Sequence, residues 1–246
     1  MTLDTTNEKL GVGCYDYDGS TTAKTLLGAT SMWDFIHTAS AWAMSFWINI
    51  SSVTESQVFN QNVNPPTNAF DYILLSSTNA RLRVRGTSIS YAHGFSADTW
   101  HHVVFTYDGT DITIYTDNTL KNTTAYTEGG STGSAPITIA HSYVDSNHGD
   151  FLMDDMGIWE RALTTGEISA LYDEGSGALV SSLSDKSNLK AYYSFDTNTA
   201  NVCPNDYSST SPLDLVSGVR TNSIFIQTDD TPSYWWFSGS AWVAGA

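Results

Sequence analysis

Apolar and polar residues alternate with a period of two along much of the chain, which is the spacing of a β-strand with one buried face. The clearest example is the segment Ala41–Ile50. Its large apolar side chains fall on one face, at Trp42, Met44, Phe46, Ile48 and Ile50. The pattern predicts a strand that packs this face into a core.

A second run, Trp100–Tyr115, contains two β-branched and aromatic stretches on either side of Asp108–Asp111. Strand formers flank a glycine that tolerates positive φ, so the sequence predicts a β-hairpin. A further turn at Asp117-Asn118 leads into a third stretch, Thr119–Tyr126. None of the three stretches has a helical period, and we expect a three-stranded meander.

Shorter strands and one helix are expected elsewhere. Thr164 and Glu167 have the spacing of a capping box, and Gly175 supplies a stop, which together predict a short helix over Thr164–Glu174. Further strands are predicted at Leu10–Asp18, Gln57–Asn60, Phe70–Ser76, Ala80–Arg85, Ser88–Tyr91, Pro136–Ala140 and Phe151–Glu160.

The net charge of the chain disfavours some classes of binding partner. Twenty Asp and six Glu stand against ten Lys and Arg, which gives a formal net charge of −16. Such a surface repels nucleic acid and anionic membranes, so we expect neither nucleic-acid binding nor membrane insertion. The first twenty residues contain no basic region followed by an apolar one, and we therefore expect no secretory signal in this chain. Either the protein acts without this export route or the sequence belongs to a longer chain.

Two smaller features leave alternatives open. Arg81, Arg83 and Arg85 fall on one face of a predicted strand, which is either a solvated outer face or a surface that recognises an anionic sugar or a partner's carboxylates. Cys14 and Cys203 are the only cysteines. Two cysteines do not make a disulfide scaffold, and whether they are bridged stays open.

Two motifs carry a family resemblance. Trp100–Gly109 reads Trp-His-His-Val-Val-Phe-Thr-Tyr-Asp-Gly and resembles the central hairpin of laminin-G-like domains in the concanavalin A-like lectin/glucanase superfamily. Phe151–Leu163, with its Asp-Asp pair and its Glu-Arg-Ala-Leu ending, resembles the closing strand of the same family. The resemblance implies an all-β fold: a concanavalin A-like jelly-roll β-sandwich of two antiparallel sheets, with one short helix after the closing strand.

The order of the segments departs from the family. Leu189–Asp196 resembles the strand that normally opens such a domain, yet here it comes late. Either the domain is circularly permuted, with this strand returning beside Phe151–Trp159, or a truncated second copy follows. We favour permutation because too few residues remain for another sandwich. The predicted domains are a sandwich over residues 1–222 and an aromatic hairpin over residues 223–246 packed on it.

The resemblance also implies a metal site. Many family members hold one structural calcium with the first acid of the closing strand, which here is Asp154. Asp18 and Asp196 would converge on it if the late strand pairs as expected. The alternative is a set of separate turn and strand acids. Zinc is excluded at His101-His102, because adjacent residues of a strand point to opposite faces.

Sugar binding has its own candidates. Neutral glycans are held by aromatic faces beside Asp, Asn and Arg side chains. The aromatic and polar residues expected in loops and near the C-terminus are Trp33, Tyr143, Asp145, Asn147, His148, Trp235 and Trp236. Trp42, Trp47, Trp100 and Trp159 stand at strand positions that the family uses for core packing.

Catalysis is not expected. The six glutamates form no Glu-x-Asp-x-Glu arrangement, and no Gly-x-Ser-x-Gly motif is present. We predict a non-catalytic carbohydrate- or protein-binding adhesion module with a structural calcium, located outside the cell or on a virion or cell surface. The alternative is a decoration, fibre or tail component of a virion or surface layer that assembles as a homo-oligomer.

Overall fold

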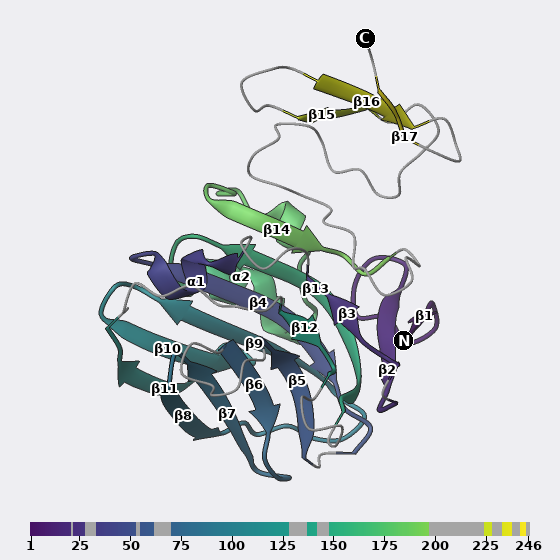
Figure 1. The fold of residues 1–246 in the computed structure, drawn as a ribbon. Coiled ribbons are helices and arrows are strands. Elements are labelled where there is room, and N and C mark those ends of the chain that lie inside the picture. Colours follow the sequence, from purple (N-terminus) through teal and green to yellow (C-terminus); the bar gives the residue numbers. More distant parts are fainter. Residues whose placement is uncertain are drawn as a thin grey trace.

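A computed structural model describes residues 1–20, 22–27, 33–52, 55–61, 70–127, 137–141 and 148–196, and three later strands (Figure 1). Two antiparallel sheets dominate the described part of the chain. The strands predicted from period-two alternation are present, and the predicted all-β sandwich of two sheets is confirmed.

The larger sheet has eight strands, seven of them in the order β1-β2-β13-β4-β9-β10-β11. Their bounds are β1 Thr2–Asp4, β2 Cys14–Asp18, β4 Trp42–Asn49, β9 Trp100–Tyr107, β10 Asp111–Thr116, β11 Thr119–Ala125 and β13 Asp150–Trp159. The predicted meander forms β9, β10 and β11, which pair in sequence order.

The smaller sheet has six strands in the order β3-β12-β5-β6-β7-β8. Their bounds are β3 Thr25–Leu26, β5 Ser56–Asn60, β6 Phe70–Leu74, β7 Asn79–Val84, β8 Thr87–Ala92 and β12 Thr138–Ile139. On the outer face of this sheet, the Asp71 carboxylate forms ion pairs with the guanidinium groups of Arg81 (3.4 Å) and Arg83 (3.1 Å). Two of the three arginines of the predicted basic face are therefore paired within the chain.

The eighth strand of the larger sheet is β14 (Leu189–Tyr193), the late strand that resembles a family opening strand. It pairs with the second half of β13, from Met156 to Trp159. The first half of β13, from Asp150 to Met153, pairs with β2. Two strands from opposite ends of the sequence thus share one edge of β13, one after the other.

Three strands near the C-terminus form a separate antiparallel sheet, β15 (Ile224–Gln227), β16 (Ser233–Phe237) and β17 (Trp242–Ala244). The predicted hairpin accounts for the pairing of β15 with β16, and β17 adds a third strand. The boundary between residues 222 and 223, and the packing of this unit on the sandwich, stay predictions.

The main core lies between the two sheets. Phe46 is at its centre and contacts Phe59, Tyr72 and Phe105 with edge-on or steeply inclined rings. A second cluster, which includes Trp159, Leu171 and Tyr192, lies on the outer face of the larger sheet. Both clusters are fully or almost fully buried, so the larger sheet buries apolar side chains on both of its faces.

Short helices cover part of that outer face. They are α2 (Thr165–Tyr172) and the single turns η3 (Asp173–Gly175) and η4 (Val180–Ser182), whereas α1 (Phe35–Thr38) precedes β4. The predicted capping box at the start of α2 is confirmed, because Thr164 and Glu167 satisfy each other's backbone amides.

Arg161 connects α2 to the segment before β14. Its guanidinium donates to both carboxylate oxygens of Glu167, at 2.6 and 3.0 Å, and to the carbonyls of Ala162, Asp185 and Ser187. The planar guanidinium group of arginine carries five N–H donors and can make this set of contacts, whereas the single ammonium group of a lysine cannot.

Two adjacent histidines of β9 have different surroundings. His101 Nδ1 is hydrogen-bonded to the Asp117 carboxylate (2.7 Å), and its ring stacks on Phe95. His102 is hydrogen-bonded to Ser45 Oγ at 2.8 Å, and its ring packs at a tilt against Trp47. Burial lowers the pKa of His102 to about 3, so its imidazole is neutral in the folded protein at neutral pH.

We expect Arg161→Lys to lower the free energy of unfolding by about 2 kcal/mol, because several carbonyl and carboxylate acceptors lose their donors. Urea denaturation measures the change. The matched control is Lys190→Met, which removes the exposed pair between Lys190 and Glu160 (2.6 Å) and should change stability by about 0.5 kcal/mol or less. Equal effects of the two substitutions would contradict the role given to Arg161.

We expect the contribution of His102 to stability to fall as the pH drops below the ordinary histidine value of 6.5. A histidine whose pKa is lowered in the folded state stabilises it above 6.5 and loses this contribution as the pH falls toward 3. The pKa values of His37 and His93 are also lowered by burial, so all three contribute to the slope. His102→Gln should flatten the slope by up to about 1.4 kcal/mol per pH unit. Parallel curves for the two proteins between pH 6.5 and 4 would refute this assignment.

Candidate binding site

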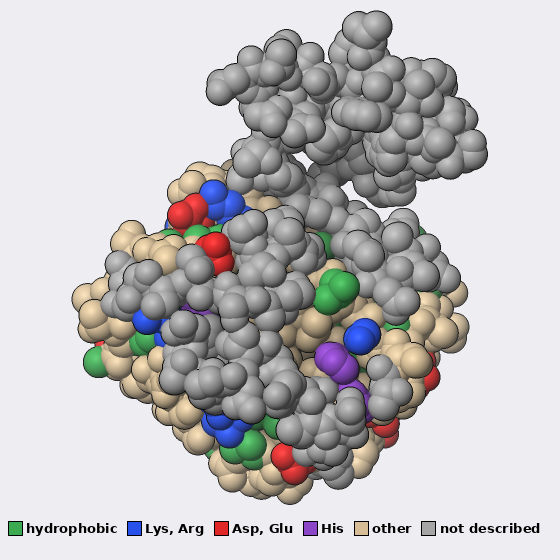
Figure 2. Space-filling view, in the orientation of Figure 1, with side chains coloured by type: hydrophobic (Ala, Val, Ile, Leu, Met, Phe, Trp, Pro, Cys, Tyr) green, Lys and Arg blue, Asp and Glu red, His purple; other side chains and the backbone are tan. Residues whose placement is uncertain are grey.

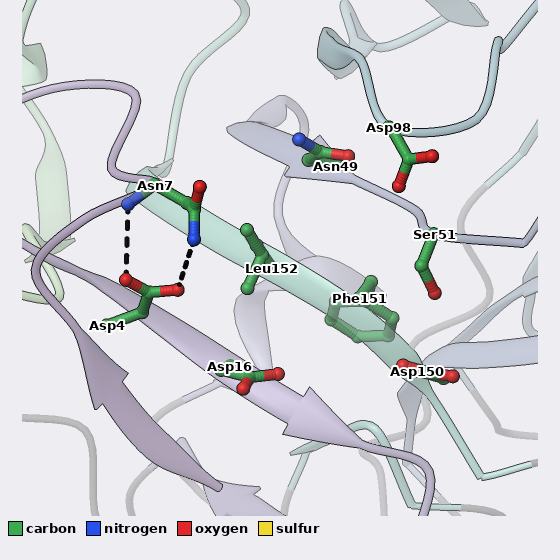
Figure 3. A pocket seen from close by; sticks show the side chains of 9 residues that line it. All are labelled: Asp4, Asn7, Asp16, Asn49, Ser51, Asp98, Asp150, Phe151 and Leu152. Atoms are coloured by element: carbon green, nitrogen blue, oxygen red, sulfur yellow. Dashed lines mark hydrogen bonds between the residues drawn. The ribbon is translucent and has the colours of Figure 1, made fainter.

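A pocket of about 360 Å³ lies where β1 and β2 meet β13 and the end of β4 (Figure 3). Four carboxylates, two amides and one hydroxyl line it beside an exposed part of β13. The lining residues are Asp4, Asn7, Asp16, Asn49, Ser51, Asp98, Asp150, Phe151 and Leu152.

Strand register sets the floor of this pocket. Leu152 of β13 is paired with Asp16 of β2 on one side and with Asn49 of β4 on the other. Directly paired residues of antiparallel strands point to the same face, so these three side chains form a row on the outer face of the sheet. Phe151 points the other way, into the core beside Tyr17.

The walls come from turns at both sides. Asp98 belongs to the turn before β9, and its backbone amide donates to Ile50 O at 2.9 Å. Asp4 is the last residue of β1, and Asn7 belongs to the segment that follows it. The Asp4 carboxylate accepts hydrogen bonds from the amides of Thr6 (2.7 Å) and Asn7 (3.1 Å) and from the Asn7 side chain (2.8 Å). Asp4 therefore fixes the shape of this wall.

The pocket is strongly negative. Burial raises the pKa of Asp16, and the neighbouring carboxylates of Asp4, Asp18 and Asp150 raise it further. No lysine or arginine is among the lining residues. The arrangement offers acceptors to hydroxyl and amino groups, and it disfavours anionic ligands.

Asp154, the first acid of the family motif, is fully buried and engaged by the backbone. One carboxylate oxygen accepts from the amides of Lys9 (2.9 Å) and Leu10 (2.8 Å), and the other accepts from Asp155 N (2.8 Å). Burial raises the pKa of Asp154 to about 8, while these three donors act in the opposite direction.

The structure does not bring the three predicted calcium ligands together. Asp18 is paired with Asp150, four residues along β13 from Asp154, and its carboxylate accepts from Ser20 N at 3.0 Å. Asp196 accepts from the amides of Val12 (2.6 Å) and Gly13 (3.0 Å). Among the described residues no group of three or more acids, histidines or cysteines could hold a metal ion. Calcium binding stays a prediction, but Asp18, Asp154 and Asp196 do not form one common site for the ion.

The predicted sugar ligands have varied positions. The prediction that Trp33 binds a sugar is wrong. Its side chain is fully buried, donates to Leu27 O and contacts Phe35, so it belongs to the core and cannot stack on a sugar. His148 is half-buried and stacks on His141, with ring centroids 5.3 Å apart. Tyr143, Asp145 and Asn147 lie outside the described residues. Trp235 and Trp236 lie in β16, where only the backbone is described.

Sequence reasoning missed the pocket. Asp16 and Asp18 alternate on one strand, and this spacing was the available signal that two carboxylates share a face. The other lining residues come from separate segments with ordinary turn or strand sequences. The registers of β2, β13 and β4 bring the floor residues together, and the segments on both sides add the walls.

The sequence matches the family model of the concanavalin A-like lectin/glucanases superfamily (Laminin_G_3) over residues 19–169, which is more than half of the chain. The chain therefore belongs to this superfamily, and its fold is of the lectin-like type. No curated protein matches the sequence. Among the described residues no helix is long and apolar enough to span a membrane.

Solved structures share the fold at low identity. The receptor-binding domain of botulinum neurotoxin C/D mosaic serotype aligns with a TM-score of 0.52 and 15% identity over 70% of this chain and 45% of its own. A provisionally assigned carbohydrate-binding protein from Bacteroides ovatus gives 0.51 and 15%, over 65% and 47%. The K499G mutant of NanB sialidase from Streptococcus pneumoniae gives 0.52 and 12%, over 64% and 27%. Such likeness shows the fold alone, and this chain covers less than half of each of these proteins.

We expect Asp154→Asn to destabilise the protein by about 2–4 kcal/mol, because the new amide group must face backbone donors that it cannot accept from. The matched control, Asp18→Asn, keeps an acceptor for Ser20 at an exposed position and should have an effect of about 0.5 kcal/mol or less. Thermal melts of both variants with and without EDTA provide the measurement. A calcium ion held by these acids would instead make EDTA lower the wild-type midpoint and make both substitutions costly.

Proposed function

We propose that this chain is a non-catalytic binding module that holds a hydroxyl-rich saccharide in the pocket around Asp16, Leu152 and Asn49. The composition of the pocket carries the proposal. Carboxylate and amide oxygens accept hydrogen bonds from sugar hydroxyls, and Leu152 offers an apolar surface to the C–H groups of a ring. The volume of about 360 Å³ is within the range of small-molecule sites and suits a small saccharide.

The negative charge of the pocket determines which classes of saccharide it favours. Four aspartates line the pocket, and the whole chain carries a formal net charge of −16. A sulfated or carboxylated sugar would bring a like charge into a partly desolvated site. The preferred ligands are therefore neutral or amine-bearing.

Binding is favoured over hydrolysis. Glycoside hydrolysis needs two free carboxylates placed on either side of the scissile bond. Asp4 is engaged with its own turn, and two of the three solved structures described above are binding proteins by name. Cleavage of a bound saccharide, followed by chromatography, is the outcome that would replace this proposal with an enzymatic one.

The alternative of a virion or surface-layer component requires a large apolar contact between copies. On the face drawn in Figure 2 the hydrophobic side chains of the described residues are scattered. The large apolar residues exposed in the described part of the chain are Val12, Leu26 and Leu120, which lie on three separate segments. Saccharide binding therefore has the stronger support, and light scattering of the intact chain tests for an oligomer.

We expect an array of neutral, amine-bearing and sulfated glycans to show binding of the first two classes and not of the third. Asp16→Asn should lower the affinity for a bound glycan at least tenfold, since a charged acceptor is lost. Asp108→Asn is the matched control, because Asp108 is exposed and follows the far end of β9 from the pocket. Equal affinity of wild type and Asp16→Asn, or preference for sulfated glycans, would overturn the proposal.

A further inference from the structure

The segment between β1 and β2, residues 5–13, crosses the outer face of the larger sheet and is here named the strap. Its first part is a wall of the pocket, through Asn7. The Asn7 carbonyl accepts a hydrogen bond from the Trp100 indole at 3.1 Å, and Asn7 also bonds to Asp4. The position of this wall therefore depends on what holds the strap.

Asp154 holds the middle of the strap. Its carboxylate accepts from the amides of Lys9 and Leu10, and it is fully buried on β13. The Lys9 side chain extends over the Trp47 ring, 4.4 Å from its centroid, and donates to Gly175 O at 2.6 Å. The strap is thereby connected to β4 and to η3.

Asp196 holds the end of the strap. A single oxygen, Oδ1, accepts from both Val12 N and Gly13 N. The carboxylate packs so closely on Gly11 that a Cβ at this position would collide with it, and Gly11 has a φ of +68°. Phe195 is fully buried against Tyr15 and Tyr193, which fixes the backbone that presents Asp196.

We propose that Asp154 and Asp196 are positioning residues of the saccharide site, which hold the strap closed so that Asn7 and Asp4 form the pocket wall. This inference rests on the proposed function. Neither acid lines the pocket, and each acts through backbone amides of the strap. Strand β14 thereby gains a second role, because the residues that follow it hold a segment from the other end of the sequence.

Coupling of this kind is reciprocal. If strap closure strengthens saccharide binding, a bound saccharide must stabilise strap closure by the same factor. The Trp100 indole N–H reports closure directly, since it donates to the strap. The nuclear magnetic resonance signal of this N–H is therefore a local marker of strap closure. A general loss of stability would not shift the signal as long as the protein stays folded.

The test compares Asp196→Ala with Asp196→Asn. Alanine removes the acceptor of two strap amides, whereas asparagine keeps an oxygen that can accept from both. We expect Asp196→Ala to shift the Trp100 indole signal, to raise amide exchange at Val12 and Gly13 at least tenfold, and to weaken binding of the array-identified glycan about tenfold. Asp196→Asn should restore most of each change, and Asp185→Asn, at an exposed turn, should change none of them.

Two outcomes separate this inference from the proposed function. If Asp16→Asn abolishes glycan binding while Asp196→Ala opens the strap and leaves the affinity unchanged, the positioning role is wrong and the site stands. If Asp16→Asn has no effect, the site itself is wrong. Should Asp196→Ala not fold, Lys9→Met loosens the strap through its contacts with Trp47 and Gly175, and the same readouts apply.

Discussion

The structure depends on two adjacent buried carboxylates at an irregularity of its longest strand. Asp154 and Asp155 lie where the register between β13 and β4 shifts, and Asp155 has a φ of +44°. Asp154 accepts from amides of the strap, and Asp155 accepts from Val180 N at 3.0 Å and from the Tyr192 hydroxyl at 2.5 Å. Two carboxylates buried without donors would each cost several kcal/mol. The N-terminal strap, the turn at η4 and β14 supply the donors for these two acids, so all three segments stabilise the fold at β13.

The same requirement explains how a strand late in the sequence becomes part of this sheet edge. The edge of β13 is filled by β2 along its first half and by β14 along its second half, and the two acids lie between these pairings. A sheet is stabilised by its spatial neighbours, so the position of a strand in the sequence matters less than the edge that it fills. Strand β14 supplies both ladder hydrogen bonds and the Tyr192 hydroxyl, which makes it part of the sandwich.

The sequence predicts what depends on local pattern. Alternation predicts β4, the hairpin signal predicts β9 and β10, and the spacing of Thr164 and Glu167 predicts the start of α2. The role of Asp154 cannot be predicted in this way, because its partners are backbone amides of Lys9 and Leu10, which leave no trace in side-chain identity. The family resemblance implied a metal ligand at this residue, and the structure gives the same carboxylate a set of amide donors.

The burial of Trp33 and the existence of the pocket could not be predicted from the sequence, for a different reason. Trp33 lies in a short segment with no period-two alternation, and only the packed structure shows that its side chain is buried, donates to Leu27 O and contacts Phe35. The pocket requires the registers of three strands at once, and an error of one residue in any of them would turn Asp16 or Asn49 to the core. Local patterns do not carry that information, since register is set by contacts between distant segments.

One strand face connects the pocket to the buried acids. Asp150, Leu152 and Asp154 alternate on the outer face of β13, so the same row begins in the open pocket and ends at the carboxylate that holds the strap. The strap returns along the same face and places Asn7 beside the pocket. A ligand that contacts Leu152 and Asn7 together therefore contacts both the rigid strand and the segment held on it by Asp154. Because the contact with Asn7 requires the strap to lie on β13, the hydrogen bonds from the Lys9 and Leu10 amides to Asp154 serve the fold at β13 and, in the function proposed above, recognition in the pocket as well.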